Sequence, residues 1–227
     1  MLNNIIVVFS SHRSPEENET FTQRVKKSIG TSVEVFAYPN FNQYSLSEIY
    51  NKAMKEHNNK NSIMVFCHND IHFYTKDWGK RLLAKFNNTN YSIIGVAGTT
   101  YLPEKGMWWE KPELMIGIVN HTNGLRIWES RYSEEFVGVR PVVLIDGCFM
   151  AVNCNNIEDQ FDEDFKGFHF YDLAFCVPNY LDGCNIGVVT DIRILHESVG
   201  MINEQWDQNR QQFVEKYKND LPLIYEA

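Results

Sequence analysis

Two residues with metal-binding side chains stand close together in the sequence. His68 and Asp70 are separated by one residue and follow the apolar run 62–67, which is typical of a buried strand. Side chains at this spacing lie on the same side of an extended segment. A carboxylate oxygen suits hard cations such as Mg²⁺, and Mn²⁺-like ions also accept imidazole nitrogen. The pair therefore predicts a divalent-cation site, with an ordinary solvated loop after a strand as the alternative.

His196 is a third candidate ligand, much further along the chain. It follows the strand-like segment 191–195. A single histidine is usually a hydrogen-bonded residue of the surface or core. His196 therefore joins the metal site only if the fold returns it to Asp70.

Two aspartates lie among apolar residues and could carry acid–base chemistry. Asp172 follows the aromatic stretch 168–171, where loss of solvent would raise the pKa of a carboxyl group toward that of a general base. The alternative role for this residue is a helix N-cap. Asp146 and Gly147 interrupt the apolar run 142–150, where a carboxylate must find a bonding partner. The backbone of a β-bulge would be sufficient.

Trp108 and Trp109 are adjacent in the segment 98–112, which is rich in glycine, proline and aromatic residues. They could stack on a sugar ring or a nucleobase, or form a lid that packs on the core. The residue types do not decide between these roles. Cys67 adjoins His68, but neighbouring side chains of a strand point apart, so we expect Cys67 in the core.

The composition limits the class of partner. The sequence has 227 residues, a formal charge of −8 and 14% aromatic residues. So many aromatic residues predict a packed core rather than disorder. The negative charge disfavours binding to nucleic-acid polymers, because phosphate chains are repelled. An anionic small molecule can still bind if a metal ion supplies a local positive charge.

Several protein classes lack their sequence signatures here. Five cysteines at irregular spacing, with no CxxC pair, disfavour a disulfide scaffold and a structural zinc site. Neither GxGxxG nor GxxxxGK[ST] occurs, so Rossmann dehydrogenases and P-loop NTPases lose their main support. No apolar stretch approaches ~20 residues, and the first residues lack a basic region. We therefore expect a cytoplasmic protein with no export signal and no membrane span.

The first half of the sequence alternates strand-like and helix-like segments. The expected strands are 5–10, 32–38, 62–67 and 91–97, and the expected helices are 15–29, 45–57 and 75–87. Strands joined by single helices run parallel, with right-handed crossovers, in an open α/β sheet. Ligands of such sheets bind at the carboxyl ends of the strands. Those ends carry Ser10, Ser11, His12, Tyr38, Pro39, Asn40, His68, Asn69 and Asp70.

The second half is less regular. Segment 114–128 predicts a β-hairpin around Asn123 and Gly124, a pair that favours a type I′ turn. We also expect one strand over 142–152 with a break at Asp146, another strand over 186–190, and helices over 171–181 and 203–217. No repeat or linker divides the chain, so residues 1–227 are expected to form a single domain.

Taken in order, these segments resemble glycosyltransferase family 2, and in particular the bacterial glycosyltransferase-like branch whose metal motif reads H-x-D. The similarity spans roughly residues 3–217. It is carried by segments 5–11, 48–53, 65–71, 145–151, 161–165 and 168–173. The resemblance implies a glycosyltransferase A-type fold: a mostly parallel central sheet flanked by helices, with a small antiparallel hairpin in the second half. Residues up to about 100 would form the nucleotide-binding half, and residues 101–227 the acceptor-side half.

The resemblance also implies a reaction. A metal-dependent, inverting enzyme would move a sugar from a nucleotide-diphosphate donor to a glycan or other hydroxyl acceptor, with surface polysaccharide synthesis as the setting. Asp70 matches the last aspartate of the D-x-D metal motif, and His68 replaces its first. His196 resembles the late histidine that completes the metal shell around Mn²⁺ or Mg²⁺. Asp172 matches the aspartate of the E-D motif and would be the catalytic base, while Tyr171 replaces the glutamate.

The remaining site residues follow from the same resemblance and from the aromatic segments. The nucleotide would contact Ser10, Ser11, Asn40 and Asn51. The donor or acceptor sugar would contact Asp146, Gly147, Trp108, Trp109 and Tyr171.

Two other functions compete with this interpretation. Because His68 and Tyr171 replace the usual acids, the protein could be a non-catalytic binder of a nucleotide sugar or glycan. It could also be a metal-dependent phosphoesterase acting on a nucleotide diphosphate. The transferase hypothesis requires Asp70 and His196 in one metal shell, with Asp172 across the same cleft.

Overall fold

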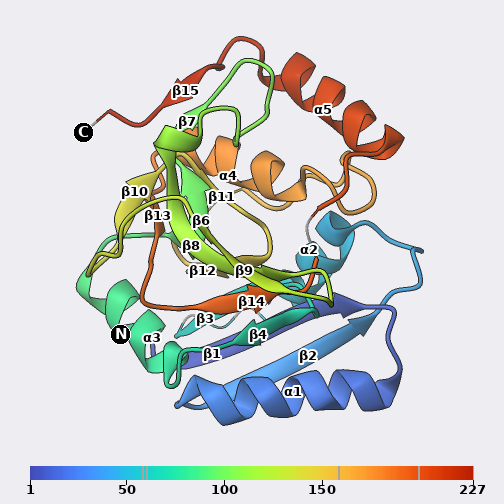
Figure 1. Ribbon diagram of the computed structural model, residues 1–227, viewed down its shortest axis with the longest axis vertical. Helices are drawn as coiled ribbons and strands as arrows, with labels where there is room; N and C mark the ends of the chain where they lie inside the picture. Colours follow the sequence, from blue (N-terminus) through green and yellow to red (C-terminus); the bar gives the residue numbers. More distant parts are fainter. Residues whose placement is uncertain (58, 60, 158, 199, 227) are drawn as a thin grey trace.

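The computed structural model describes residues 1–57, 59, 61–157, 159–198 and 200–226. A seven-stranded sheet runs through its middle in the order β10-β13-β5-β12-β3-β1-β2 (Figure 1). Its strands are β1 (Asn4–Ser11), β2 (Val33–Pro39), β3 (Ser62–Cys67), β5 (Ile93–Gly95), β10 (Arg140–Val142), β12 (Phe149–Val152) and β13 (Ile186–Val188).

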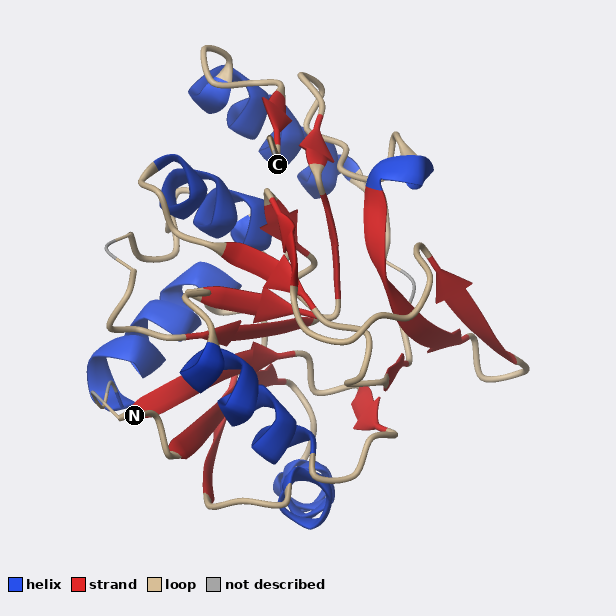
Figure 2. Cartoon of the chain, turned by 90° about the vertical axis from the view of Figure 1, so that its left-hand side faces the viewer, coloured by secondary structure: helices blue, strands red, loops and turns tan. Residues whose placement is uncertain are grey.

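Helices cover both faces of this sheet (Figure 2). Side chains alternate along β1, so that Ile5, Val7 and Phe9 join the core on the side of α1 (Pro15–Ile29) and α3 (Trp78–Asn88). Ile6 and Val8 face the opposite core, which contains side chains of α2 (Leu46–His57), α4 (Tyr171–Leu181) and α5 (Glu204–Tyr217). The central strands therefore read as continuous apolar runs, because both of their faces are buried.

Local capping signals set where the first helices begin. Ser14 and Glu17 form a capping box at the start of α1, and Gly30 ends that helix in the left-handed conformation with φ 75°. Ser45 and Glu48 exchange the same pair of hydrogen bonds before α2. The expected helices 15–29 and 45–57 are thereby confirmed to within one residue.

The sheet is mixed because β12 enters it from the second half of the chain. β1 pairs parallel with β2 and β3, and β5 pairs parallel with β13. β12 lies antiparallel between β3 and β5, and β10 is antiparallel to β13. β3 and β5 consequently run in the same direction, as expected of strands joined by a helix, but they are not neighbours.

A second sheet adjoins the first, and the chain passes from one to the other at several points. Its order is β11-β6-β8-β14-β4, with β9 added beside β8. Its strands are β4 (Ile71–Phe73), β6 (Ala97–Thr99), β8 (Met115–Thr122), β9 (Ile127–Arg131), β11 (Leu144–Ile145) and β14 (Ile194–His196). Two expected strands are divided between the sheets: 91–97 becomes β5 and β6, and 142–152 becomes β10, β11 and β12. Because each sheet takes part of one apolar run, hydrophobicity alone does not mark the division.

The hairpin of the second half is confirmed, but its turn differs from the prediction. β8 and β9 pair antiparallel as far as Thr122 and Ile127, which leaves a four-residue loop. A type I′ turn needs positive φ at both central residues, and here Gly124 has it (φ 82°) whereas Asn123 does not. Asn123 instead caps the loop by accepting hydrogen bonds from the N–H groups of Leu125 and Arg126.

The remaining elements belong to the second half of the chain. A 3₁₀ turn (Pro112–Leu114) precedes β8, and β15 (Leu223–Ile224) pairs with β7 (Tyr101–Leu102) near the C-terminus. Among the described residues, no helix is both long and apolar enough to cross a membrane.

Candidate active site

Strand pairing brings the three predicted metal ligands together. His68 follows β3, Asp70 precedes β4, and His196 ends β14. β4 and β14 are antiparallel, with His196 opposite Ile71, and the N–H of Glu197 donates to the carbonyl of Asp70 over 3.0 Å. The second sheet therefore returns His196 to Asp70, as the metal hypothesis requires.

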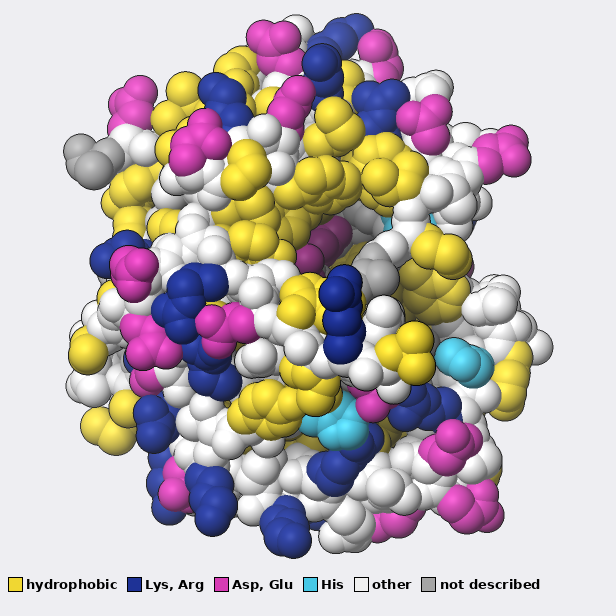
Figure 3. Space-filling model, viewed as in Figure 1, with side chains coloured by type: hydrophobic (Ala, Val, Ile, Leu, Met, Phe, Trp, Pro, Cys, Tyr) yellow, Lys and Arg dark blue, Asp and Glu magenta, His cyan; other side chains and the backbone are white. Residues whose placement is uncertain are grey.

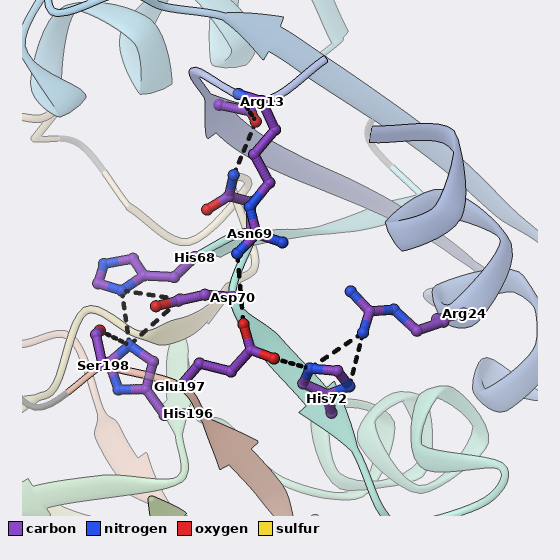
Figure 4. Close-up of polar contacts among 10 residues, drawn as sticks. Arg13, Arg24, His68, Asn69, Asp70, His72, His196, Glu197 and Ser198 are labelled. Atoms are coloured by element: carbon purple, nitrogen blue, oxygen red, sulfur yellow. Dashed lines mark hydrogen bonds and ion pairs between the residues drawn. The ribbon is translucent and has the colours of Figure 1, made fainter. Parts of the chain in front are cut away.

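The ligand atoms of these side chains have a separation that suits one ion. His68 Nδ1 lies 3.1 Å from His196 Nε2, although 128 residues separate them in sequence (Figure 4). Asp70 Oδ1 lies 3.4 Å from His196 Nε2 and 3.9 Å from His68 Nδ1. Two ligands bound at about 2.1 Å to one cation stand about 3.0–3.4 Å apart at ordinary coordination angles, a range that both distances from His196 Nε2 meet.

The electrostatics of the triad also fit a cation. Asp70 Oδ1 is buried and accepts no hydrogen bond from any described residue, which is costly for a carboxylate oxygen. Burial opposes ionisation of Asp70, but the close approach of His196, whose Nε2 lies 3.4 Å from Oδ1, and the charge of His68 hold the pKa of Asp70 well below its usual range. Burial lowers the pKa of His68, and the charge of His196 adds to this effect. An ionised carboxylate beside a neutral imidazole is a donor set for a divalent cation.

A chain of charged hydrogen bonds supports the triad from behind (Figure 4). His72 on β4 contacts Glu197 over 2.6 Å and Arg24 of α1 over 2.7 Å. The second carboxylate oxygen of Glu197 lies 3.4 Å from Arg13. Glu197, which adjoins His196, is thus tied to the segment after β1 and to β4.

Asp172 lies in the first turn of α4. Its Oδ2 accepts the N–H of Gly147 over 2.9 Å, and its Oδ1 accepts the N–H of Leu173 over 3.0 Å. Burial and the nearby charge of Asp146 raise the pKa of Asp172 to about 7. The residue at the N-cap position is Phe170, so Asp172 does not take the capping role that the sequence left open. A carboxyl group with this pKa is poised to accept a proton near neutral pH.

Asp146 keeps its place in the break between β11 and β12. Its Oδ1 accepts the N–H of Cys148 over 2.8 Å, and its own N–H donates to Ala97 over 2.9 Å. The carboxylate therefore has the backbone partner that its apolar surroundings demand.

Two cavities meet at the triad. The first measures about 470 Å³ and is lined by His68, His196, Asp146, Asp172 and a group of aromatic side chains. Figure 3 shows it as a hollow with a largely hydrophobic rim and an acidic side chain at depth. The second measures about 510 Å³ and lies at the ends of β1, β2 and β3. His68, Phe168, Ser198 and Met201 line both cavities.

A family model described as "Glycosyltransferase like family" matches residues 4–217. The chain belongs to this glycosyltransferase-like family. The predicted family and the predicted transferase class are thereby confirmed. No curated protein matches the sequence.

Solved structures show the same fold for this glycosyltransferase. Three of them are GalNAc-T7 with UDP, GalNAc and Mn²⁺ (10% identity, TM-score 0.59), the mannosyltransferase PcManGT from Pyrobaculum calidifontis with GDP-Man and Mn²⁺ (8%, 0.58), and S. aureus TarS (13%, 0.56). The chain is covered over 95%, 97% and 96% of its length, and it spans 48%, 65% and 39% of theirs. At these identities the likeness establishes the glycosyltransferase A-type fold, not the substrates.

The predicted nucleotide contacts of the glycosyltransferase fall into two groups. Ser10, Ser11 and Asn40 line the second cavity, whereas Asn51 binds the backbone of Phe161 through both ends of its amide. Two of the cavity residues already form hydrogen bonds within the protein. Ser11 Oγ accepts the side-chain N–H of Asn69 over 2.7 Å, and the amide of Asn40 bonds to the backbone of residues 43 and 44.

The predicted sugar contacts all line the first cavity of the glycosyltransferase, but they differ in exposure. Trp108 is 7% exposed and belongs to the core, whereas Trp109 is 38% exposed. Trp108 therefore packs in the core, and stacking on a ligand stays a prediction for Trp109. Tyr171 is 3% exposed, and its hydroxyl lies 2.9 Å from His68 Nε2. Gly147 packs against Tyr171, where a Cβ atom would stand 2.1 Å from the hydroxyl oxygen.

The sequence did not single out two residues of the first cavity. Trp206 stands in the first turn of α5 with its ring 5.8 Å from that of Trp109. His121 comes from β8 and lies 5.9 Å, ring to ring, from His196. The surplus of aromatic residues was a signal for Trp206, but only the fold shows that it meets Trp109. Phe168, in the aromatic segment where the sequence predicts a wall for a sugar, is 44% exposed and lines both cavities.

Proposed function

We propose that this glycosyltransferase moves a sugar from a nucleotide-diphosphate donor to a hydroxyl acceptor, with a divalent cation and with inversion at the anomeric carbon. The position of the triad carries the proposal. His68, Asp70 and His196 offer ligand atoms within 4.8 Å of one another, at the junction of the two cavities. A diphosphate bound there would extend its nucleoside into one cavity and its sugar into the other.

The residues fit the cation that the family implies. Two imidazole nitrogens and one otherwise unpartnered carboxylate oxygen favour Mn²⁺-like ions, and leave room for diphosphate oxygens in the shell. When bound, such an ion neutralises the diphosphate and makes it a better leaving group. GalNAc-T7 and the Pyrobaculum mannosyltransferase have been solved with Mn²⁺, which supports the same choice here.

Asp172 would act as the base. Its carboxylate takes the proton of the acceptor hydroxyl, the oxygen attacks the anomeric carbon, and the bond to the diphosphate breaks. A single displacement of this kind inverts the anomeric centre. The backbone N–H groups of Gly147 and Leu173 fix the carboxylate, so that it keeps its direction toward the first cavity.

The aromatic wall suits a sugar acceptor. Trp109 and Trp206 come from different segments and meet at the rim of the cavity that Asp172 lines. Aromatic rings of this kind bury large apolar area with few rotatable bonds, and they can stack on the face of a pyranose.

The deciding experiment is calorimetry with UDP, GDP and their sugars, in the presence and absence of Mn²⁺, followed by product analysis with a glycan acceptor panel. We expect metal-dependent binding and transfer. Binding without turnover would indicate the non-catalytic alternative. Hydrolysis of the donor that no acceptor diverts would indicate the phosphoesterase. Absence of any metal-dependent nucleotide binding would contradict the transferase and the phosphoesterase, and would leave only a glycan binder of the non-catalytic kind.

We also propose a cytoplasmic setting and a role in surface polysaccharide synthesis. All five cysteines lie within the described residues, and none is in a disulfide. Thiols of this kind are typical of a reducing compartment. Fractionation of expressing cells, with analysis of surface glycans after deletion of the gene, tests both points.

A further inference from the structure

The two positions at which this chain departs from the common acidic motifs of glycosyltransferase family 2 are in contact with each other. His68 stands for the first aspartate of the metal motif, and Tyr171 stands for the glutamate before the base. Tyr171 Oη lies 2.9 Å from His68 Nε2 across 103 residues of sequence. The two side chains that differ from the acidic pattern therefore touch directly.

The imidazole of His68 has two nitrogens with different surroundings. Nδ1 faces His196 Nε2 at 3.1 Å and Asp70 Oδ1 at 3.9 Å, whereas Nε2 faces the hydroxyl of Tyr171. A neutral imidazole has one N–H and one lone pair, and a metal ligand uses the lone pair. Ligation through Nδ1 therefore requires the hydrogen on Nε2, where a phenol oxygen can accept it.

Tyr171 is held firmly enough to fix this hydrogen bond. It is the first residue of α4, its side chain is 3% exposed, and its ring packs 5.8 Å from that of Tyr50. Gly147 leaves the space that the hydroxyl occupies. Phe170, just before it, adopts φ 65°, a conformation unfavourable for an aromatic residue. Contacts of Phe170 with Trp206 and Phe213 maintain that turn of the backbone.

We propose that Tyr171 is a positioning residue: its phenol oxygen accepts a hydrogen bond from Nε2–H of His68 and so presents the Nδ1 lone pair to a divalent cation shared with Asp70 and His196. The inference rests on the metal site of the proposed function. Partners of this kind orient ligating histidines and typically change metal affinity 10- to 100-fold. The first turn of α4 then carries both the proposed base, Asp172, and Tyr171, which orients the metal ligand His68.

The first test measures Mn²⁺ binding without nucleotide, by electron paramagnetic resonance titration of wild-type protein and the variants Tyr171→Phe and Tyr50→Phe. Tyr50 is the matched control, because its hydroxyl is buried beside Tyr171 and has no hydrogen-bond partner among the described residues. We expect Tyr171→Phe to raise the Kd for Mn²⁺ about 10-fold or more. Tyr50→Phe should leave that Kd unchanged. Equal Kd values for wild type and Tyr171→Phe would overturn the proposal.

The second test needs no variant and covers the case in which Tyr171→Phe does not fold. Long-range ¹H–¹⁵N spectra of the Zn²⁺-bound wild-type protein report which nitrogen of His68 carries hydrogen. We expect the hydrogen on Nε2, and a hydrogen on Nδ1 would contradict the proposal. Wild-type protein that binds neither Mn²⁺ nor Zn²⁺ removes the metal site and the inference together. Metal binding without sugar transfer would reject the proposed function alone.

Discussion

Gly147, between β11 and β12, and Asp172, in the first turn of α4, both line the first cavity and are joined by one hydrogen bond. The N–H of Gly147 donates to Oδ2 of Asp172 over 2.9 Å. A side chain at position 147 would collide with Tyr171, so only glycine allows this approach. The first turn of α4 therefore packs on the backbone between β11 and β12. Through this contact Gly147 fixes both the proposed base, Asp172, and Tyr171, which contacts His68.

Replacing the proposed base should separate binding from chemistry. We expect Asp172→Asn to lower the rate of transfer by about 10²- to 10⁴-fold, the usual contribution of a general base. The Kd of the nucleotide donor should change less than about 2-fold, because the asparagine keeps an oxygen for the N–H of Gly147. Asp182→Asn, at the other end of α4, is the matched control. A variant that transfers sugar at the wild-type rate would remove Asp172 from the mechanism.

The pKa of Asp172 makes transfer depend on pH. Burial and the charge of Asp146 raise this pKa from 3.8 to about 7, so the basic form predominates only above that pH. We expect kcat/KM of the wild-type protein to rise with pH through an apparent pKa near 7 and then level off. A profile that is flat from pH 5 to pH 8 would contradict the assignment.

The same shift links folding stability to pH. Between about pH 4 and pH 7 the native carboxyl holds a proton that the unfolded chain has released, so the free energy of unfolding should fall as pH rises. The loss across this window is at most about 4 kcal/mol. Urea unfolding of metal-free wild type and Asp172→Asn at several pH values tests this, and the variant should show the smaller slope. Equal slopes would mean that Asp172 ionises normally.

Local patterns predicted the first half of the fold well. β1 and β3 follow from apolar runs with both faces buried, and the ends of α1 and the start of α2 follow from their capping residues. The second half depends on long-range pairing that the residue types do not encode. β12 inserts between β3 and β5, and β6 leaves β5 after one residue to join another sheet.

The residues of the candidate site also differ in how far local sequence predicts them. The spacing of His68 and Asp70 was enough to suggest a metal site, because one strand end carries both. His196 needed the family resemblance, since only the pairing of β4 with β14 brings it near. The contact between Tyr171 and His68 joins two elements whose register no local pattern sets.

The donor set predicts which metal ions the protein prefers. Two imidazole nitrogens and one carboxylate favour transition ions over Mg²⁺, with affinity rising from Mn²⁺ to Co²⁺. We expect calorimetry to give Kd values in the order Co²⁺ below Mn²⁺ below Mg²⁺. His68→Asp replaces a nitrogen ligand by oxygen, so the ratio of the Mg²⁺ and Mn²⁺ Kd values should shrink about 10-fold. An unchanged ratio in this variant would exclude His68 from the metal shell.

The two adjacent tryptophans should respond oppositely to truncation. Trp108 is 7% exposed in the core, so Trp108→Ala should lower the free energy of unfolding by about 3–5 kcal/mol. Trp109 is 38% exposed at the rim, so Trp109→Ala should cost less than about 1 kcal/mol of stability. It should instead raise the acceptor KM about 10-fold, equivalent to about 1.4 kcal/mol of lost binding. Urea unfolding and acceptor kinetics at saturating donor provide both measurements. An acceptor KM that Trp109→Ala leaves unchanged would place the acceptor elsewhere in the cavity.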